Sequence, residues 1–566
     1  MQTQGTRMNT ATLNLAWADA FIAALTAAGL RHIVLAPGAR SAPLAVAALR
    51  RPELTCHVVS DERAAGYFAL GLVRGMAPTS RMPAAVICTS GTAVANLMPA
   101  VMEANLAAIP LLILSADRPP EAHGWGSHQT ADQLKLYGDH ARRFFALPVP
   151  FVGAEEALDH RYLNGLAAQL IEASQTPVPG PVHANQPFRE PLLPIDPGAI
   201  PSAPNLPVPV TIRAPIPQAA SGLEGVAERL SGRTGLILCG EGDYPETFAA
   251  ALVALADKLG APILAEPLSN LRFGPHDRRL VLTRASRFLR RTDLPQPEWV
   301  LRLGRFPVSR TLERWLAGLE HTLHILIAPP GPWPDPLRRS DILLRGDALA
   351  TVTALHAAPT ASAPAGWLST WQAQEIDAAQ HTDLCHDGHA FAQAVSTLIA
   401  ALPAKAHLFV GNSLSIRAVD SFSGTHAKPL TLHGNRGAAG IDGNLATAAG
   451  ISAAHGAPMA VLIGDQTALH DCGSLALLAG RPVVVIVVDN GGGGIFEQLA
   501  FSAALPPEIL TRGFIAPPQV DFSALARAFG LSYAEADDVP RLQPLLDQAF
   551  TSRQPWLIRL ALKSSA

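Results

Sequence analysis

The sequence predicts an α/β protein with three doubly wound α/β domains. Apolar runs of strand length alternate with helical segments along the first part of the chain and again along the last part. This alternation is typical of parallel sheets whose crossover helices cover both faces. A third, weaker series of apolar runs lies between the two. At 566 residues the chain is also too long for a single hydrophobic core.

The first segment is predicted to run from the strand at residue 32 to the strand that ends at residue 116. Its strands are His32–Pro37, Cys56–Ser60, Ala84–Thr89 and Leu111–Ala116, with helices that begin at Ala42, Ala64 and Ala93. The last segment repeats the pattern, with strands at His407–Val410 and Leu430–His433, helices after Ser413 and around Leu445–His455, and two apolar runs that start at Val461 and Val483. The middle segment has strands at Gly235–Cys239, Ala261–Ala265, Trp299–Leu303 and Leu323–Ala328.

We expect the domains to comprise residues 1–190, 191–365 and 366–566. The stretch Thr176–Gln218 is dense in proline and has little periodicity, so it is predicted to be an ordered linker on the surface that leads into the central domain. The second boundary is placed near Ala357–Ala365, which is rich in Ala, Pro, Ser and Thr.

Composition narrows the class of protein. The 48% hydrophobic and 16% charged content describe a globular protein, and a net charge of −3 gives no reason to expect a nucleic-acid partner. The five cysteines are scattered without C-x-x-C spacing, which favours reduced thiols over disulfides or a zinc site. No apolar run reaches membrane-spanning length and the amino terminus lacks an apolar signal core. We therefore expect a cytoplasmic protein without membrane insertion.

The two apolar runs in the last segment each end in an oxygen ligand. Gly464-Asp465 follows the first run and Asp489-Asn490-Gly491 follows the second, so Asp465 and Asn490 are 25 residues apart, enough for one crossover helix at about 468–478. Parallel strands of this kind bring one carboxylate and one amide to neighbouring strand ends, where open α/β sheets bind ligands. Such oxygen ligands suit Mg²⁺ that shares its shell with a phosphate. We predict Asp465, Asn490 and the carbonyl of Gly492 as the metal ligands; an ordinary core strand followed by a turn is the alternative.

This arrangement resembles the metal–diphosphate motif of thiamine diphosphate (ThDP) enzymes, usually Gly-Asp-Gly and later Asn-Asn, although Gln466 and Asp489 depart from it. Longer runs are more specific; they are 35–44 (LAPGARSAPL), 88–97 (CTSGTAVANL), 115–121 (SADRPPE), 411–417 (GNSLSIR), 435–443 (NRGAAGIDG) and 494–496 (GIF). These runs resemble the MenD family, the ThDP-dependent 2-succinyl-5-enolpyruvyl-6-hydroxy-3-cyclohexene-1-carboxylate (SEPHCHC) synthases of menaquinone biosynthesis. The similarity covers all three segments and is weakest in the middle one and across the linker.

The resemblance implies a ThDP-dependent transferase of the 2-oxoglutarate-decarboxylating type. The cofactors would be ThDP and Mg²⁺, with Mn²⁺ able to replace Mg²⁺. On ThDP, 2-oxoglutarate would lose CO₂, and the resulting succinyl carbanion would add to isochorismate in a 1,4-addition. It also implies a pyrimidine-binding (Pyr) domain in residues 1–190, a diphosphate-binding (PP) domain in residues 366–566, and a homodimer or homotetramer.

The resemblance further assigns roles to single residues. Glu62, at the end of the second strand, would activate the cofactor as the catalytic group. The other cofactor contacts would be Ser413, Leu414, Gly437, Ile441, Gly464, Asp465, Gln466, Asn490 and Ile495. Since guanidinium groups bind carboxylates bidentately, the arginines suit two anionic substrates. The implied substrate-binding residues are Arg40, Arg118, Gln129, Arg310, Arg417, Arg436 and Phe496.

Several departures and alternatives stay open. Ala39 replaces a serine of the family pattern and His128 an asparagine, which we interpret as tuning of binding. The nearest alternative among enzymes is another ThDP decarboxylase or carboligase, such as acetolactate synthase, but such enzymes commonly carry Arg-His-Glu-Gln where this chain has Ser60-Asp61-Glu62-Arg63. A second alternative is a nucleotide-binding or regulatory protein that kept the fold but lost catalysis, which the altered Gly-Asp-Gln and Asp-Asn motifs would fit. Gly240-Glu241-Gly242 also hints at a dinucleotide turn, without the full spacing.

Overall fold

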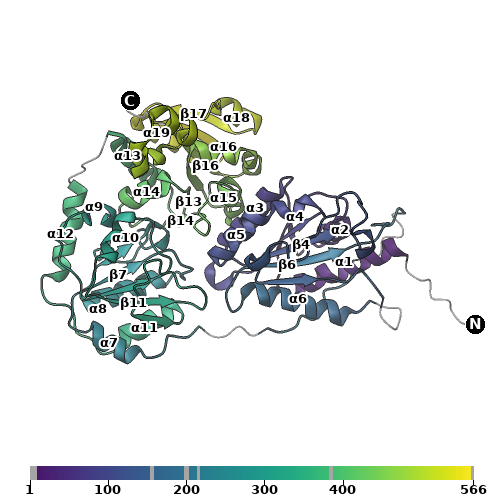
Figure 1. Ribbon diagram of the computed structural model, residues 1–566, viewed down its shortest axis with the longest axis horizontal. Helices are drawn as coiled ribbons and strands as arrows, with labels where there is room; N and C mark the ends of the chain where they lie inside the picture. The colour runs from purple at the N-terminus through teal and green to yellow at the C-terminus, as the bar shows by residue number, and fades with distance from the viewer. Residues whose placement is uncertain (1–8, 153–157, 197–202, 213–216, 381–385, 563–566) are drawn as a thin grey trace, which may run out of the picture. The chain divides into compact units, whose positions relative to one another are not determined.

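The computed structural model describes the chain except residues 1–8, 153–157, 197–202, 213–216, 381–385 and 563–566. The chain divides into two compact units. Unit 1 consists of Met1–Ala214, Asn435–His455 and Gly473–Leu477, and unit 2 of Pro215–Gly434, Gly456–Cys472 and Leu478–Ala566. Unit 1 holds one six-stranded parallel sheet and unit 2 holds two (Figure 1), which confirms the predicted fold class.

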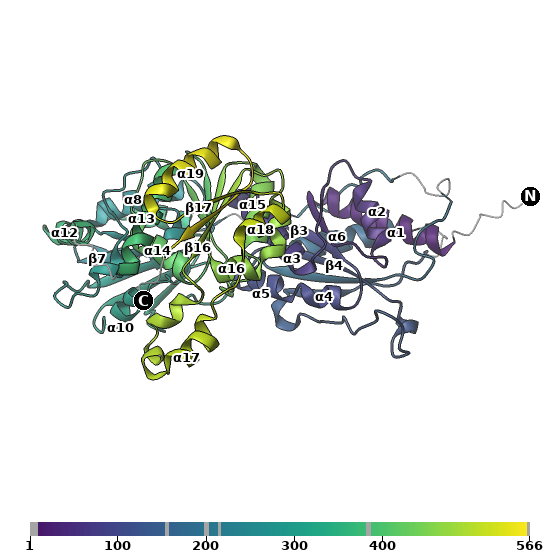
Figure 2. The same cartoon turned by 90° about the horizontal axis from the view of Figure 1, so that it is seen from above.

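The sheet of unit 1 has the strand order β2-β1-β3-β4-β6-β5. The strands are β1 (His32–Leu35), β2 (Thr55–Val58), β3 (Ala84–Cys88), β4 (Leu111–Asp117), β5 (Arg143–Ala146) and β6 (Pro181–Pro187). Helices α1 (Thr10–Ala27), α2 (Ala42–Leu49) and α6 (His160–Gln175) share a hydrophobic core with one face of the sheet. Helices α3 (Glu62–Arg74), α4 (Thr92–Asn96) and α5 (Met98–Ala107) form a second layer, and α15 (Asn444–His455) packs along α3 (Figures 1 and 2).

The first sheet of unit 2 has the order β12-β11-β10-β7-β8-β9. Its strands are β7 (Gly235–Cys239), β8 (Ile263–Ala265), β9 (Val281–Leu282), β10 (Trp299–Leu303), β11 (Leu323–Ala328) and β12 (Ile342–Arg345). One core lies under α7 (Leu223–Leu230), α8 (Phe248–Leu259) and α11 (Ala348–Ala357), and a second core lies under α9 (Ala285–Phe288), α10 (Arg310–Ala317) and α12 (Trp367–Gln380).

The second sheet of unit 2 has the order β14-β13-β15-β16-β18-β17. Its strands are β13 (His407–Val410), β14 (Thr431–His433), β15 (Met459–Gly464), β16 (Val483–Asp489), β17 (Ser532–Ala536) and β18 (Trp556–Ala561). Helices α13 (His386–Ala401), α14 (Leu414–Phe422) and α19 (Val539–Ser552) cover one face. The short helices α16 (Asp465–His470), α17 (Pro507–Leu510) and α18 (Phe522–Ala528) lie in the later connections.

The order of the strands fixes where ligands can bind. Counted from their own first strands, the sheet of unit 1 and the last sheet share the order 2-1-3-4-6-5, so the winding reverses between β1 and β3 and again between β13 and β15. The middle sheet reverses between β7 and β10. In open parallel sheets the connecting loops diverge at such a reversal and leave a crevice at the carboxyl ends of the strands.

The structure corrects three predictions about elements. The proline-dense stretch predicted to be a surface linker contains β6, a buried strand between β4 and β5, because its polar side chains find hydrogen-bond partners inside the sheet. The crossover helix predicted at about 468–478 is α16 followed by a 3-10 segment from Cys472 to Leu478. The helix expected from Ala93 is interrupted at Leu97, since Pro99 begins a new helical turn.

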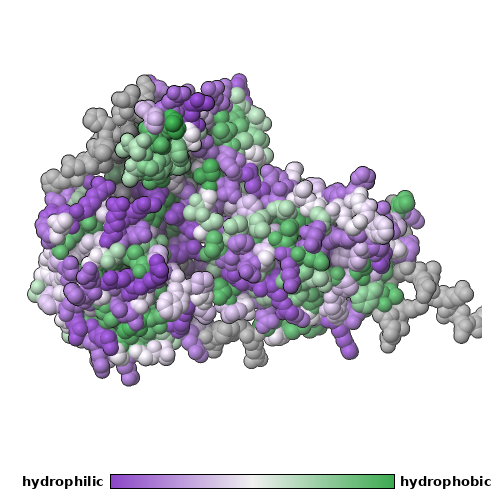
Figure 3. Space-filling model, viewed as in Figure 1, coloured by the Kyte–Doolittle hydropathy of each residue, from purple (hydrophilic) through white to green (hydrophobic). Residues whose placement is uncertain are grey.

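No helix in the described part of the chain is long and apolar enough to cross a membrane. On the face drawn in Figure 3, hydrophobic residues occur in small groups between hydrophilic ones.

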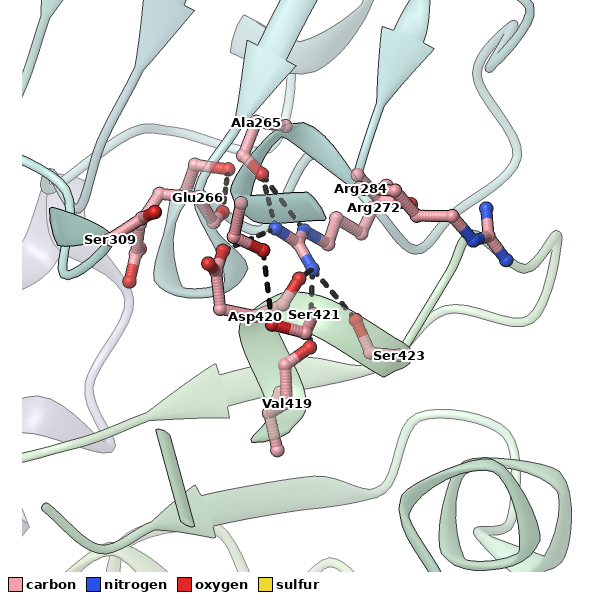
Figure 4. Close-up of polar contacts among 12 residues, drawn as sticks. Ala265, Glu266, Arg272, Arg284, Ser309, Val419, Asp420, Ser421 and Ser423 are labelled. Atoms are coloured by element: carbon pink, nitrogen blue, oxygen red, sulfur yellow. Dashed lines mark hydrogen bonds and ion pairs between the residues drawn. The ribbon is translucent and has the colours of Figure 1, made fainter. Parts of the chain in front are cut away.

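Within unit 2, a buried arginine joins the middle sheet to helix α14 (Figure 4). Arg272 donates from Nε and Nη2 to the carbonyl of Ala265 at 2.9 and 2.6 Å. It also donates to the carbonyls of Val419 and Asp420 and to the Asp420 carboxylate, at 3.2, 2.8 and 2.9 Å. The last carbonyls of a helix lack partners within the helix. Arg272 therefore closes the carboxyl end of α14 and fixes that helix against the middle sheet.

A second buried carboxyl group lies beside this arginine. Glu266 is 6% exposed and accepts a hydrogen bond from the backbone N–H of Leu268 at 2.7 Å. Burial raises the pKa of Glu266 to about 8, and the nearby Asp420 carboxylate adds to the effect. Between about pH 5 and pH 8, the folded protein therefore keeps a proton on Glu266 that the unfolded chain has released.

Because the pKa is raised on folding, this group contributes a loss of stability as the pH rises from about 5 to 8. Glu266→Gln keeps an acceptor for Leu268 and removes the titration. We expect the melting temperature of the variant, relative to that of the wild type, to increase by about 2–5 °C between pH 5 and pH 8 in calorimetric scans. Glu508→Gln, at an exposed carboxylate, is the control and should follow the wild type. Parallel profiles for Glu266→Gln and wild type would contradict the assignment.

Candidate functional site

The predicted metal ligands come together in unit 2. Strands β15 and β16 pair in parallel with Gly464 opposite Val488, so Asp465 and Asn490 follow neighbouring strand ends. The Asp465 carboxylate is 1% exposed and accepts hydrogen bonds from the backbone N–H groups of Gln466 and Gly492 at 2.6 and 2.7 Å. Gly492, the third predicted ligand, is therefore hydrogen-bonded through its N–H to Asp465, the first.

The charges at this strand edge suit a cation. Burial raises the pKa of Asp465 to about 6, and the nearby Asp489 carboxylate adds to this. Among the described residues, no group of three or more His, Cys, Asp or Glu side chains is placed so that it could hold a metal ion by itself. A metal here would complete its shell with amide or carbonyl oxygens and with ligand oxygens, which is the way proteins hold Mg²⁺ beside a phosphate. The residues present fit that group.

The departures from the usual motif have structural partners. Asp489 accepts a hydrogen bond from Arg559 Nε at 2.7 Å, and Arg559 also pairs with Glu535, so the extra carboxylate is compensated by a cation on β18. Gln466 donates from its side chain to the carbonyl of Ala516 at 2.5 Å and so anchors the segment at 511–516.

Glycine is required in the loop that follows β16. Gly492 has φ +116°, and a Cβ there would lie 2.3 Å from the carbonyl oxygen of Ile515. The predicted residues Ile495 and Phe496 lie in the short helical segment Gly494–Gln498, where Phe496 packs edge-on against Phe514 with ring centroids 5.7 Å apart.

The other residues that we predict in unit 2 lie at the end of β13 and on α10. Ser413 directly precedes α14 and has φ +66°, ψ −127°, a conformation that is nearly restricted to glycine and is typical of functional sites. Arg417 donates to the Ser413 carbonyl at 2.8 Å, which ties this arginine to the same turn as Leu414. Arg310 is exposed at the start of α10, next to the middle sheet, so it belongs to a different sheet from the rest of this group.

In unit 1, two predicted substrate-binding arginines are brought together. The loops after β1 and β3 approach closely, since a Cβ on Gly38 would lie 2.3 Å from Thr89 Cβ. Arg40 is 5% exposed and donates to the carbonyl of Phe188 at 3.0 Å. Arg40 and Arg118 both donate to the same oxygen of Glu190, at 2.5 and 3.2 Å.

A buried amide network holds the loops of this region. Gln133 accepts from the N–H of Gly91 at 2.8 Å and donates to the carbonyl of Ala116 and to Asn185 Oδ1 at 3.1 and 2.7 Å. Gln129 donates to the carbonyl of Ser90 at 3.0 Å, while His128 beside it is exposed. The sequence motifs gave no indication of Gln133 or Asn185, whose partners come from distant strands.

Glu62 is the first residue of α3, directly after the capping residue Asp61, whose side chain accepts from the N–H of Ala64 at 3.2 Å. The Asn96 side chain donates to Glu62 Oε2 at 3.3 Å. The carboxyl group is half-buried at a helix amino terminus, next to the end of α4.

The segment that contains Arg436, Gly437 and Ile441 also belongs to unit 1. Its backbone N–H groups at Gly437 and Ala438 donate to the two oxygens of Glu103, at 2.8 and 2.6 Å. Tyr67 donates to Asp442 at 2.7 Å. Glu103, which is buried on α5, was not found from the sequence because an isolated Glu in a helix carries no motif. The Ile441 side chain is exposed.

At the reversal in the middle sheet, the loop after β10 packs against the turn that follows β7. Gly240 donates to the carbonyl of Leu303, and a Cβ on Gly240 would lie 1.8 Å from the carbonyl oxygen of Arg305. The loop after β10 therefore fills the place where a dinucleotide would approach the turn at Gly240-Glu241-Gly242. The geometry does not support the nucleotide-binding alternative.

Comparison with known proteins gives the family. Residues 16–136 match the N-terminal TPP binding domain of thiamine pyrophosphate enzymes, and residues 420–560 match the C-terminal TPP binding domain. A SEPHCHC synthase from Dechloromonas aromatica is 44% identical over 553 residues, which cover 97% of this chain and 98% of that protein. Relatives with the same description from Chloroflexus aurantiacus and Halobacterium salinarum are 37% and 36% identical and cover 94% and 93% of this chain, with 91% of each relative covered. The chain belongs to the ThDP-dependent SEPHCHC synthase family.

Proposed function

We propose that this protein is a SEPHCHC synthase that decarboxylates 2-oxoglutarate and adds the succinyl group to isochorismate. The observation that supports this most directly is that Asp465, Asn490 and Gly492 lie together at a strand edge that suits a cation. The full-length relatives of the chain are described as SEPHCHC synthases. The shared strand order of the first and last sheets is consistent with one sheet for each half of the cofactor.

When bound, ThDP supplies the nucleophilic carbon and the electron sink that a 2-oxo acid needs to lose CO₂. Asp465, Asn490 and the Gly492 carbonyl would hold Mg²⁺ and, through it, the diphosphate. Glu62 would hold a proton against the ring nitrogen of the aminopyrimidine. The remaining cofactor contacts would come from Ser413, Leu414, Gly437, Ile441, Gly464, Gln466 and Ile495.

The substrates are anions, and the proposed residues for them are mostly cations. Arg40 and Arg118 form one pair, and Arg417 and Arg436 follow strands β13 and β14. Arg310, Gln129 and Phe496 complete the proposed set. Arginine stays charged when it is buried and presents a planar fork to a carboxylate, which suits both 2-oxoglutarate and isochorismate.

We further propose that residues 1–190 act as the pyrimidine-binding domain, 191–365 as the central domain and 366–566 as the diphosphate-binding domain. Glu62 and Asp465 lie in different units. If one cofactor contacts both groups, assembly of two copies provides the required juxtaposition.

Asp465→Ala should weaken Mg²⁺-dependent binding of ThDP by more than about 100-fold in isothermal calorimetry, because even indirect partners of a bound metal are typically worth 10- to 100-fold in affinity. Circular dichroism should show that the variant folds. Asp489→Asn, which introduces the residue usual in ThDP enzymes, is the matched control and should retain cofactor binding. If Asp465→Ala binds ThDP as well as the wild type does, this strand edge is not the metal site.

Glu62→Gln should lower turnover by about 10²- to 10⁴-fold, since an amide keeps the shape but cannot supply the proton. ThDP affinity should fall only modestly, because Mg²⁺ and diphosphate contacts provide most of it. The assay follows CO₂ release from 2-oxoglutarate and, separately, isochorismate consumption. Asp61→Asn is the control, because Asn caps a helix as well as Asp does.

Three results would separate the alternatives. Wild-type protein that consumes neither substrate with ThDP and Mg²⁺ would disprove the proposed function, and activity with pyruvate alone would favour acetolactate synthase. A Glu62→Gln variant with most of the wild-type rate would leave the function intact and remove Glu62 from its role.

We expect the active protein to be at least a homodimer and to form a homotetramer made of two dimers, with closed symmetry. Multi-angle light scattering at assay concentration, with activity measured across the eluted peak, tests this expectation. Full activity in a peak with the mass of a single chain would refute it.

A further inference from the structure

The carboxylate of Glu190 lies between two arginines that we propose to bind substrate. Its Oε1 accepts from Arg40 Nη2 at 2.5 Å and from Arg118 Nη1 at 3.2 Å. The three residues come from distant parts of unit 1: the loop after β1, the end of β4 and the segment after β6. A carboxylate of the chain itself therefore occupies the position that suits a substrate carboxylate.

The two arginines are better fixed than the glutamate. Arg40 is 5% exposed, and its Nη1 is held by the Phe188 carbonyl independently of Glu190. The Arg118 side chain is 23% exposed, and its Nε is buried. The Glu190 side chain, by contrast, is 65% exposed. Its carboxylate can rotate into solvent while the arginines keep their positions.

The arginine pair also has donors that Glu190 does not satisfy. A single oxygen of Glu190 serves both guanidinium groups, and the longer contact, to Arg118, is 3.2 Å. Arg118 Nε is buried without a hydrogen-bond partner among the described residues. A carboxylate that enters from solvent could use two oxygens and reach more of these N–H groups.

We propose that Glu190 is an exchangeable counter-ion that occupies the arginine pair until a substrate carboxylate displaces it. This inference rests on the proposed function, because it takes Arg40 and Arg118 as substrate-binding residues. Glu190 compensates the buried Arg40 when no substrate is bound, where an uncompensated charge would be costly. On binding, a carboxylate of 2-oxoglutarate or isochorismate takes its place and Glu190 moves into water.

The exchange has two consequences. Glu190 competes with substrate, so it lowers the affinity for the anion. Since the Glu190 carboxylate is largely exposed to water, its ion pairs with the arginines are screened, so the competition is weak and the exchange is reversible. A neutral compound that displaced Glu190 would form no ion pair with the arginines, and so would not replace the contacts that the protein loses. The exchange therefore favours carboxylates over neutral analogues.

The test is Glu190→Gln in the full-length protein with ThDP and Mg²⁺. We expect KM for the substrate whose carboxylate binds this pair to fall by about two- to five-fold, with kcat within about two-fold of wild type. Both KM values are measured, and isochorismate is also titrated by calorimetry without 2-oxoglutarate, where no turnover occurs. Glu121→Gln is the matched control, since this nearby exposed carboxylate pairs with Arg189 and not with Arg40 or Arg118. It should leave both KM values unchanged.

Glu190→Ala, which also removes the hydrogen-bonding group, should lower the same KM. An unchanged or raised KM for both substrates in both Glu190 variants would overturn the proposal, because a residue that only orients the arginines raises KM when it is lost. This outcome differs from failure of the proposed function, in which the wild-type protein would consume neither substrate.

Discussion

Parallel pairing of the strands is the constraint on which the rest of the structure depends. In each of the three sheets every paired strand runs in the same direction, so all strand carboxyl ends meet along one edge. The winding reverses between β1 and β3 and between β13 and β15, which leaves room for a ligand at those points. Arg40, Ser413 and Asp465 follow β1, β13 and β15 respectively, so the candidate site residues occupy the positions that the topology leaves open.

These loops keep their positions because buried polar groups hold them. Glu103 accepts the N–H groups of Gly437 and Ala438, and Arg272 closes the end of α14. Gln133 joins the loop after β3 to the end of β4. A buried group of this kind costs free energy unless it is fully hydrogen-bonded, and each of them is bonded to backbone. The hydrogen bonds that offset the cost of burying these polar groups therefore also orient the residues that would contact a ligand.

The sequence predicted those parts of the molecule whose signal is local. Apolar runs of strand length located β15 and β16, and the polar residues at their ends located Asp465 and Asn490. Strand β6 was missed because His183 and Asn185 are polar, and only the folded sheet provides Ser115 as their partner. Glu190, Glu103 and Gln133 were missed for the same reason. Their contacts with Arg40, Gly437 and Gly91, respectively, join residues more than 40 positions apart, and no periodicity or motif encodes such a pairing.

The two charge pairs near the proposed ligand sites differ in a way that fits their surroundings. Asp489 and Arg559 are 15% and 32% exposed, and Arg559 is held a second time by Glu535, so this pair is a fixed part of the strand edge. Its cation balances a carboxylate that would otherwise add charge beside Asp465. In the pair of Arg40 and Glu190 the cation is 5% exposed and the anion 65% exposed, so only the anion can leave readily. A permanent pair suits a site for a resident metal and diphosphate, whereas an exchangeable one suits a substrate that binds and leaves in every turnover.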